Sequence, residues 1–190
     1  MDVDTWKKRV EAERRRKDIF FASHPQSPLS AEDRRIFRGL AYWPPDPAYR
    51  NEIKMDEHKE KEILHVGDTA GRVRELLRWG AFAFDVAGQR YVLQAYKSDP
   101  NEEGLFVPFK DATSGVESYG AGRYLDLKPY EHLTKEGKWV LDLNAAYNPW
   151  CAYSEDYACP FVPPENWLEV SIRAGEKEYP LKVGGKKADE

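Results

Sequence analysis

The chain has 190 residues, of which 33% are charged and 41% hydrophobic, and its formal net charge is −4. That length suits one domain, and the slightly acidic balance argues against a dedicated nucleic-acid-binding protein, which usually carries a basic face. No apolar stretch is long enough to span a membrane, and the charged N-terminus lacks the apolar centre of a secretory signal. We therefore expect a cytoplasmic protein with no nucleic-acid or membrane partner, whose two cysteines are free thiols.

Residues 4–22 form a highly charged run that favours a helix, with Asp4 or Thr5 able to cap its start. Trp6 and Val10 provide only a weak apolar stripe. Such a run is usually a helix that packs sparingly on the body and keeps its charges in water. The alternative is a contact arm for a partner subunit or an anion.

A second, shorter helix is indicated by the sequence SAEDRRIFRG, in which Ser30 can cap the start and Gly39 the end. The three prolines of residues 42–49 then exclude regular structure and predict an extended lead into the main body. We expect a helical arm and proline-rich segment over residues 1–44 and a β-barrel-like domain over residues 45–190, within a single structural unit.

From about residue 48 the hydrophobic pattern has a period of two, which is typical of strands. Phe82, Phe84 and Val86 fall on one face, and a second strand follows a short segment with Gly88, which predicts a hairpin turn. The C-terminal residues 167–183 alternate in the same way on both sides of a glycine and predict another hairpin.

Further strands are expected at residues 104–109, 122–127 and 138–144. About seven to nine short strands at nearly even spacing favour a mostly β fold, either an antiparallel β-barrel or a curved β-sandwich, with one or two N-terminal helices. The predicted core residues are Phe82, Phe84, Val86, Leu93, Phe106, Leu125, Leu141, Val170 and Ile172.

Two loops hold most of the unusual chemistry. The first, residues 110–124, contains Asp111, Thr113, Ser114, Glu117, Tyr119 and Arg123 around three glycines. Each polar residue taken alone can serve only the turn, by bonding local backbone. As a group they suit a ligand, because the fixed donors of a half-buried arginine match a carboxylate or a phosphate.

The second loop, residues 144–167, reads NAAYNPWCAYSEDYACPFVPPENW and holds both cysteines. Its prolines stiffen the chain, which lowers the entropy cost of binding. Its tyrosines and asparagines offer flat apolar faces and paired donors and acceptors to a small molecule. The alternative is a proline-braced plug that closes one end of the barrel without a ligand.

Together, FVPFKDATSGVESYGAGRYLDL and LDLNAAYNPWCAYSEDYACPFVPPENWL resemble the signature of a bacterial and archaeal family catalogued as domain of unknown function 1684. The likeness extends over nearly the whole chain, and the motif pair is long and rich in rare residues. Trp150 stands where tyrosine is expected and Leu143 where phenylalanine is expected, and both keep aromatic or apolar character. The resemblance implies no particular activity, because none is established for the family.

Cys151 and Cys159 allow two further interpretations. Their separation does not match the close CxxC pair of a zinc site, and all four histidines lie outside the two loops, so we predict no metal centre. Thiol catalysis would need a neighbouring base, and the segment contains no histidine to supply it. Buried, inert thiols are the commonest fate of such residues, and no cofactor is predicted.

We expect a protein that binds a small polar or anionic molecule in a pocket formed by loops 110–124 and 144–167. The candidate ligand-binding residues are Arg123, Tyr119, Thr113, Ser114, Asn144, Tyr147, Asn148, Tyr153, Glu165 and Asn166. The alternative is an enzyme, a hydrolase or lyase with Asp111 or Glu117 as general base. A structural or adaptor protein is the third possibility, and the oligomeric state is left open.

Arg123 is the expected centre of that pocket, since it follows two glycines and shares a strand face with Leu125 and Leu127. If it only pairs with a buried carboxylate, its replacement by alanine should cost about 3–5 kcal/mol. If it faces a ligand, the same change should leave stability nearly unchanged, because functional sites keep unpaired charge at a cost. We expect the second outcome, with lost affinity for a carboxylate- or phosphate-bearing molecule.

Overall fold

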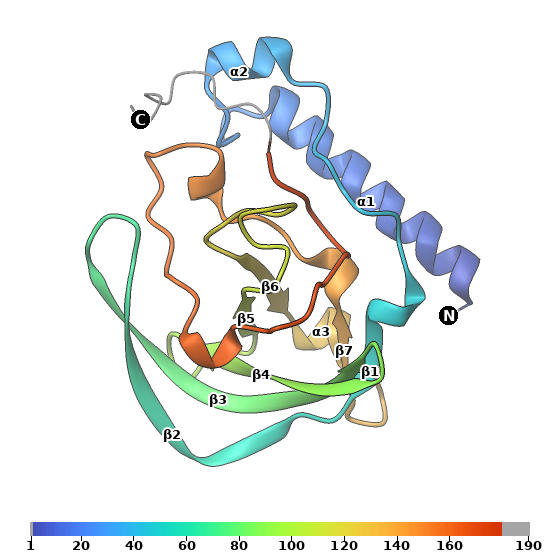
Figure 1. The fold of residues 1–190 in the computed structure, drawn as a ribbon, viewed down its shortest axis with the longest axis vertical. Coiled ribbons are helices and arrows are strands. Elements are labelled where there is room, and N and C mark those ends of the chain that lie inside the picture. Colours follow the sequence, from blue (N-terminus) through green and yellow to red (C-terminus); the bar gives the residue numbers. More distant parts are fainter. Residues whose placement is uncertain (1, 180–190) are drawn as a thin grey trace.

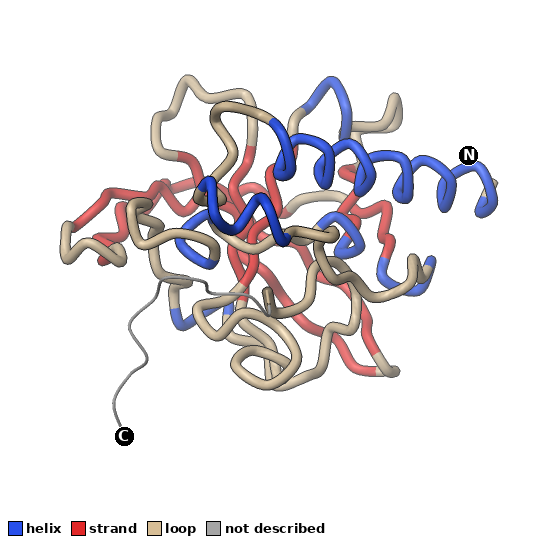
Figure 2. Tube along the Cα trace, turned by 90° about the horizontal axis from the view of Figure 1, so that it is seen from above, coloured by secondary structure: helices blue, strands red, loops and turns tan. Residues whose placement is uncertain are grey.

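Two helices begin the chain, as expected, in a computed structural model that describes residues 2–179. Helix α1 spans Val3–Ser23 and helix α2 spans Ala31–Ile36. Asp2 and Ser30 cap them by accepting from the backbone amide three residues further on, so α1 begins slightly earlier than predicted. Figure 2 shows both helices lying over loops of the body.

Five antiparallel strands form the main sheet in the order β2-β3-β4-β5-β6. They are β2 (Asp56–Gly67), β3 (Val73–Val86), β4 (Gln89–Lys97), β5 (Leu105–Phe109) and β6 (Arg123–Leu127). The predicted hairpin is β3–β4, with Phe82 opposite Leu93. Figure 1 shows β2, β3 and β4 as long curved strands on the side of the molecule away from α1.

A second sheet pairs two short antiparallel strands, β1 (Arg50–Ile53) and β7 (Trp139–Asp142). A four-residue helix, α3 (Pro129–His132), precedes β7. Within residues 2–179 the two sheets stay separate, and β2 and β6 are the edges of the larger one. The mostly β, antiparallel fold is therefore confirmed, whereas neither the closed barrel nor the sandwich is.

The turn between β3 and β4 holds two residues in the left-handed region, Ala87 (φ 52°) and Gly88 (φ 78°). Two successive positive φ values form the hairpin turn whose twist matches that of the flanking strands. Gly88 supplies one of them without a steric cost, as predicted, and Ala87 adopts the other against the usual preference of L-residues.

One apolar cluster joins both sheets to the C-terminal segment. Of the nine predicted core residues, all but Phe106 and Val170 are buried. Phe106 is half-buried because the alternation along β5 turns Leu105 and Val107 to the core and Phe106 to the other face. There its ring packs edge-on against Tyr124 at 4.8 Å between centroids.

The hairpin expected over residues 167–183 is wrong for the part that the structure describes, because residues 168–179 form no strand. Their backbone hydrogen-bonds instead to four separate places in the chain, at residues 41–43, 110–112, 117 and 146. A chain that runs between several neighbours buries alternate side chains as a half-buried strand does, so its sequence pattern is the same. The second half of the expected hairpin, with Leu181 and Val183, lies outside the described residues.

Short 3-10 turns interrupt the segments that the prolines mark. They span Pro47–Tyr49, Leu143–Ala145, Trp150–Ala152 and Pro164–Asn166. The irregular character predicted for residues 144–167 is thus confirmed. None of the described helices is long and apolar enough to cross a membrane.

Candidate functional site

Helix α1 supplies one wall of a pocket. Trp6, Val10, Arg14 and Lys17 follow one another at intervals of three or four residues, so they project from one face of the helix. Trp6 and Val10 are buried. The indole N–H of Trp6 donates to Oδ2 of Asp142 at 2.7 Å, which attaches the start of α1 to the end of β7.

The opposite wall is the end of β7 and the turn that follows it. Oδ1 of Asp142 accepts from the backbone amide of Asn144 at 3.0 Å and from its side-chain Nδ2 at 2.9 Å. Nδ2 of Asn144 also donates to the carbonyl of Asp46 at 2.8 Å, and its Oδ1 accepts from the Asp46 amide at 2.9 Å. Asn144 is therefore held by the protein and shapes the wall.

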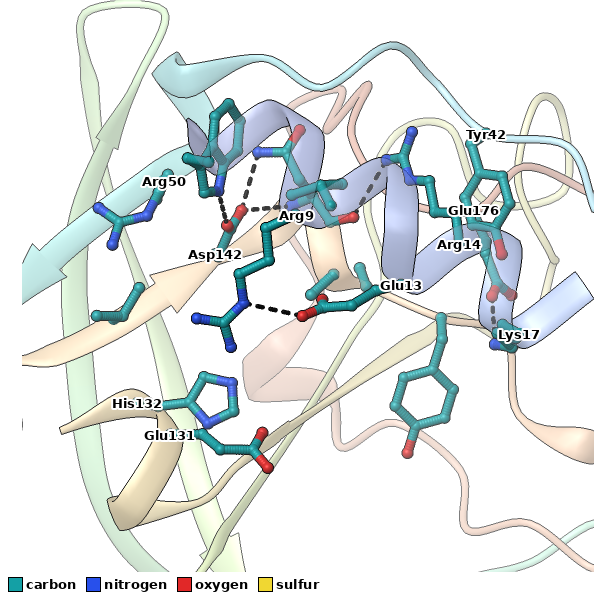
Figure 3. A pocket seen from close by; sticks show the side chains of 17 residues that line it. Arg9, Glu13, Arg14, Lys17, Tyr42, Arg50, Glu131, His132, Asp142 and Glu176 are labelled. Carbon is teal, nitrogen blue, oxygen red and sulfur yellow. Dashed lines mark hydrogen bonds and ion pairs between the residues drawn. The ribbon is translucent and has the colours of Figure 1, made fainter. Parts of the chain in front are cut away.

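Between these walls lies a pocket of about 310 Å³. Its charged and polar lining residues labelled in Figure 3 are Arg9, Glu13, Arg14, Lys17, Tyr42, Arg50, Glu131, His132, Asp142 and Glu176. They come from α1, β1, α3, β7 and irregular segments, so only the folded chain assembles them. The volume lies at the lower end of the range for small-molecule sites, roughly 300–1,000 Å³.

Arg14 is the half-buried cation of this pocket. Its Nη1 donates to the carbonyl of Trp43 at 2.7 Å, and its Nη2 donates to that of Asn144 at 3.3 Å. The guanidinium carbon lies 4.5 Å from the centre of the Tyr42 ring, and burial lowers the pKa of Arg14. Its buried Nε has no acceptor among the described residues. Arg14 thus keeps one unused donor in the pocket wall.

Glu176 is a buried carboxylate that also lines the pocket. Its Oε2 accepts from the amide of Asn148 at 2.8 Å and from the hydroxyl of Tyr153 at 2.7 Å, and Lys17 pairs with Oε1. Burial and the nearby Glu176 charge raise the pKa of Tyr153 well above its usual value, so the hydroxyl keeps its proton and donates. The carboxylate ties α1 and the second loop to the C-terminal segment.

Arg123 lies away from this pocket and is fully buried. Its Nη1 donates to the carbonyl of Ala174, while its Nη2 donates to the carbonyl of Ile172 at 2.8 Å and to Oδ1 of Asp111 at 3.2 Å. Burial lowers the pKa of Arg123, and the Asp111 charge acts in the opposite direction. Both Nη groups are taken by the protein, which is the arrangement of a structural clamp rather than of an arginine that faces a ligand.

Asp111, Thr113 and Ser114 belong to the same buried cluster. The carboxylate of Asp111 accepts from Oγ1 of Thr113 at 2.9 Å, from Oγ of Ser114 at 3.3 Å and from the amide of Ile172 at 2.7 Å. A buried carboxylate needs such donors to offset its desolvation. The group therefore fastens the first loop to the C-terminal segment and does not line the pocket.

Glu117, the other candidate base, lies on the surface and pairs with Arg173 at 2.8 Å. The hydrogen bond from Arg173 lowers the pKa of Glu117. A general base is most effective when its pKa lies near neutral pH, and this shift is in the opposite direction. The position of Glu117 therefore favours a surface ion pair.

Glu165 and Asn166 hold the end of the second loop to the main sheet. Glu165 pairs with Arg78 at 2.7 Å and accepts from the hydroxyl of Tyr96 at 2.5 Å. Asn166 receives the amide of Gln94 on Oδ1 at 2.7 Å and donates from Nδ2 to its carbonyl at 2.9 Å. The two Asn166 bonds to the Gln94 backbone resemble those between neighbouring strands. The polar groups of Glu165 and Asn166 thus bond to other residues of the protein.

Tyr119 lies beside the two cysteines. Both Cys151 and Cys159 are buried free thiols, and the Tyr119 hydroxyl is 3.7 Å from Sγ of Cys151. Within residues 2–179, no group of three or more His, Cys, Asp or Glu side chains could hold a metal ion.

Four of the predicted ligand-binding residues meet at the pocket. Asn144 and Tyr147 line it, and Asn148 and Tyr153 hold the Glu176 carboxylate at its edge. The two loops themselves pack together through backbone hydrogen bonds between residues 124 and 147, at 2.8 and 3.0 Å. The pocket therefore lies between the second loop and α1, and not between the two loops as expected.

Sequence analysis missed Arg14, Lys17 and Glu176 as site residues. The regular spacing of Trp6, Val10 and Arg14 along α1 was the available signal, because it extends the weak apolar stripe towards the helix end. Glu176 carries no local signal, since it stands among other charged residues and only the fold buries it.

Comparison with known proteins supplies a family and a structural neighbour. The family whose model matches residues 35–177 is described as a protein of unknown function (DUF1684). The chain is also similar to an uncharacterized protein of Haloarcula marismortui with a solution NMR structure, at 41% identity and a TM-score of 0.70. That similarity covers 93% of this chain and 97% of the other. No curated protein matches the chain.

Proposed function

The chain belongs to the family of proteins of unknown function DUF1684, and we propose that it binds a small molecule with an anionic group in the pocket between α1 and β7. The observation that carries the proposal is Arg14, a half-buried cation that lines the pocket and makes no ion pair with a described residue. Its Nε, like that of Arg123, has no acceptor among the described residues. A buried donor without a partner costs about 1–3 kcal/mol. Proteins tolerate such local costs mainly at functional sites.

The charge balance of the pocket supports an anionic ligand at this position. The other basic side chains are compensated in the pairs Arg9–Glu13, Lys17–Glu176 and Arg50–Glu52. Arg14 makes no ion pair with a described residue, because its two bound acceptors are neutral carbonyl oxygens. The charges of Asp142 and Glu176 act on Arg14 from a distance. A carboxylate or a phosphate would supply a direct counter-ion, and both match the donor geometry of a guanidinium.

The remaining lining suits a compact ligand with an apolar part. Val10, Val140 and Ala146 line the pocket together with the Tyr147 ring. Among the described residues Asp142 accepts hydrogen bonds from neutral donors, so its carboxylate can also attract a cationic group. A zwitterion is therefore one of the ligand types to compare with simple anions.

Calorimetric titration with succinate, glycerol phosphate and alanine separates carboxylate, phosphate and zwitterion binding. We expect at least one probe to bind the wild-type protein with a stoichiometry of one, and Arg14→Gln to weaken that binding at least tenfold, about 1.4 kcal/mol. Circular dichroism first establishes that the variant is folded, since Arg14 also bonds two carbonyls.

The matched control is Arg15→Gln, which removes the same charge from an exposed position of the same helix. It should bind like the wild-type protein. The proposal is wrong if none of the three probes binds, or if Arg14→Gln binds as tightly as the control.

A further inference from the structure

The second loop places its two cysteines against each other. The backbone amide of Cys151 lies 3.4 Å from Sγ of Cys159, in hydrogen-bond contact. Both side chains belong to one buried cluster with Tyr124 and Val162. The two cysteine side chains also share a hydrogen bond, and a disulfide requires the sulfurs to approach to about 2 Å.

The backbone on both sides of the pair is anchored. Cys151 lies in the 3-10 turn Trp150–Ala152. The Cys159 amide donates to Oγ1 of Thr69 at 3.1 Å, and its carbonyl accepts from the Thr69 amide at 3.1 Å. The backbone of each cysteine is therefore fixed by its own local contacts. Between them, residues 155 and 156 are exposed and free of core packing.

The surroundings make the two thiols unequal. Arg74 is held beside Cys159, since its Nη2 donates to the carbonyl of Ala158 at 2.9 Å and its Nε to Asp68 at 3.0 Å. The hydrogen bond from the Cys151 thiol, aided by the Arg74 charge, lowers the pKa of Cys159 to about 6 although burial opposes it. The same sulfur contact raises the pKa of Cys151. The directions of these two shifts favour ionisation at Cys159 rather than at Cys151.

A cleft lies next to this cluster, and neither cysteine is among its lining residues. Tyr124 and Pro160, the residue after Cys159, line a second cleft of about 660 Å³ on the molecule. Each cysteine keeps 9% of its surface exposed. This opening suits a reagent the size of a hydroperoxide better than a protein disulfide, which needs a broad contact with the reacting sulfur.

We propose that Cys151 and Cys159 form a redox-active dithiol that a small hydroperoxide oxidises to an intramolecular disulfide. The Cys159 thiolate attacks one peroxide oxygen, the O–O bond breaks, and the sulfur becomes a sulfenic acid while hydroxide leaves. That hydroxide takes up the proton which Cys159 lost on ionising. The Cys151 sulfur then attacks the Cys159 sulfur, the S–O bond breaks, and the departing hydroxyl takes the Cys151 proton.

The electrons and atoms of this sequence balance with hydrogen peroxide as the only co-reactant. Two thiols and one peroxide become one disulfide and two waters, so the sulfurs lose the two electrons that the oxygens gain. The site is separate from the pocket beside α1, and the inference does not depend on the proposed function.

The test treats reduced protein with one equivalent of hydrogen peroxide, then alkylates the unfolded chain and measures its intact mass. We expect the wild-type protein to lose both alkylatable thiols, to become lighter by two hydrogens, and to recover on treatment with dithiothreitol. Cys151→Ser should stop at a sulfenic acid that dimedone traps, whereas Cys159→Ser should react at least tenfold more slowly.

The pH dependence gives a second measurement on the unmodified protein. At pH 7 a thiol with the lowered pKa of Cys159 is more ionised than an ordinary thiol, so its rate should exceed that of glutathione, by less than the difference in thiolate fraction because nucleophilicity falls with the pKa. The rate should level off above about pH 7, where that of glutathione still rises.

Three results would overturn the proposal. These are a wild-type rate no higher than that of glutathione, a disulfide that links two chains, or a Cys159→Ser variant that reacts as fast as Cys151→Ser. Because the wild-type rate needs no substitution, the proposal can fail even where a variant does not fold.

Discussion

Two arginines show how the same side chain serves different ends in this molecule. Arg123 is fully buried, and its Nη groups bind three carbonyls and one carboxylate of the protein. Nε has no acceptor among the described residues in either arginine, but Arg14 is half-buried, lines the pocket and bonds only neutral carbonyls. A buried charge must be compensated. We therefore interpret Arg123 as a structural clamp and Arg14 as the candidate ligand-binding arginine.

Replacing Arg123 by alanine tests the clamp. We now expect a loss of about 3–5 kcal/mol in the free energy of unfolding, because Asp111 would stay buried without its cation. This reverses the expectation drawn from the sequence. Urea unfolding of the variant gives the value, and Arg173→Ala, which breaks only an exposed ion pair, should lose no more than about 1 kcal/mol. A loss below about 1 kcal/mol for Arg123→Ala would contradict the clamp.

Asp68 should make stability depend on pH. Burial alone would raise the pKa of this carboxyl, but hydrogen bonds from the amides of Arg72 and Ala70 and from the Arg74 side chain lower it to about 2, below the ordinary value of 3.8. A depressed pKa stabilises the fold above the ordinary value, and that contribution disappears as the pH falls towards the folded value.

The stability advantage of the wild-type protein over Asp68→Asn should therefore shrink steadily as the pH falls from about 4 to about 2. Urea melts at a series of pH values measure it. Asp85→Asn is the matched control, because Asp85 is exposed and its nearest cation is 3.9 Å away. An advantage that stays constant down to pH 2 would show that the Asp68 bonds do not favour its ionised form.

The C-terminal segment acts as an element of its own although it is not a strand. Its backbone forms hydrogen bonds with residues 41–43, 110–112, 117 and 146. The Arg123 guanidinium also donates to carbonyls of this segment. Gly175, with φ 79°, makes the bend that brings Glu176 to the pocket. A Cβ at this position would lie 2.5 Å from the carbonyl oxygen of Ala146, so the bend depends on glycine for two separate reasons.

Gly175→Ala should therefore destabilise the protein by more than the conformational cost of a left-handed residue, which is about 1–2 kcal/mol. Gly71→Ala isolates that cost, because Gly71 has φ 77° and a Cβ there would meet no atom within 4 Å. Thermal or urea unfolding of the two variants gives the difference. Equal losses would mean that the chain beside Ala146 yields to the added methyl group.

At the scale of the whole molecule, the arm, the small sheet and the C-terminal segment meet at the pocket. Phe21, Leu29 and Phe37 of the arm share an apolar cluster with Tyr153 of the second loop. Lys17 reaches Glu176 across the same junction. Segments far apart in the sequence are thus joined at one place. None of the residues that line the pocket comes from the five-stranded sheet.

Much of the fold was predictable because it rests on local rules. The cap at Ser30, the turn at Gly88 and the alternation of Phe82, Phe84 and Val86 each depend on residues within one turn or one strand. The C-terminal hairpin failed for a different reason. Residues 168–172 alternate like a strand, but their hydrogen-bond partners lie on other segments, and periodicity does not specify partners.

The sequence by itself determined the mostly β architecture, the two N-terminal helices, the irregular second loop and the family, because these follow from periodicity, caps, prolines and a long motif pair. Only the tertiary structure decided which polar side chains are satisfied by other residues of the protein and which are left to line the pocket. Asp111 and Arg123 satisfy each other, whereas Arg14 faces Asp142 and Glu176 across a pocket. Whether a charge is compensated depends on contacts that the fold makes, such as that of Lys17 with Glu176, 159 residues apart, and local sequence does not specify them.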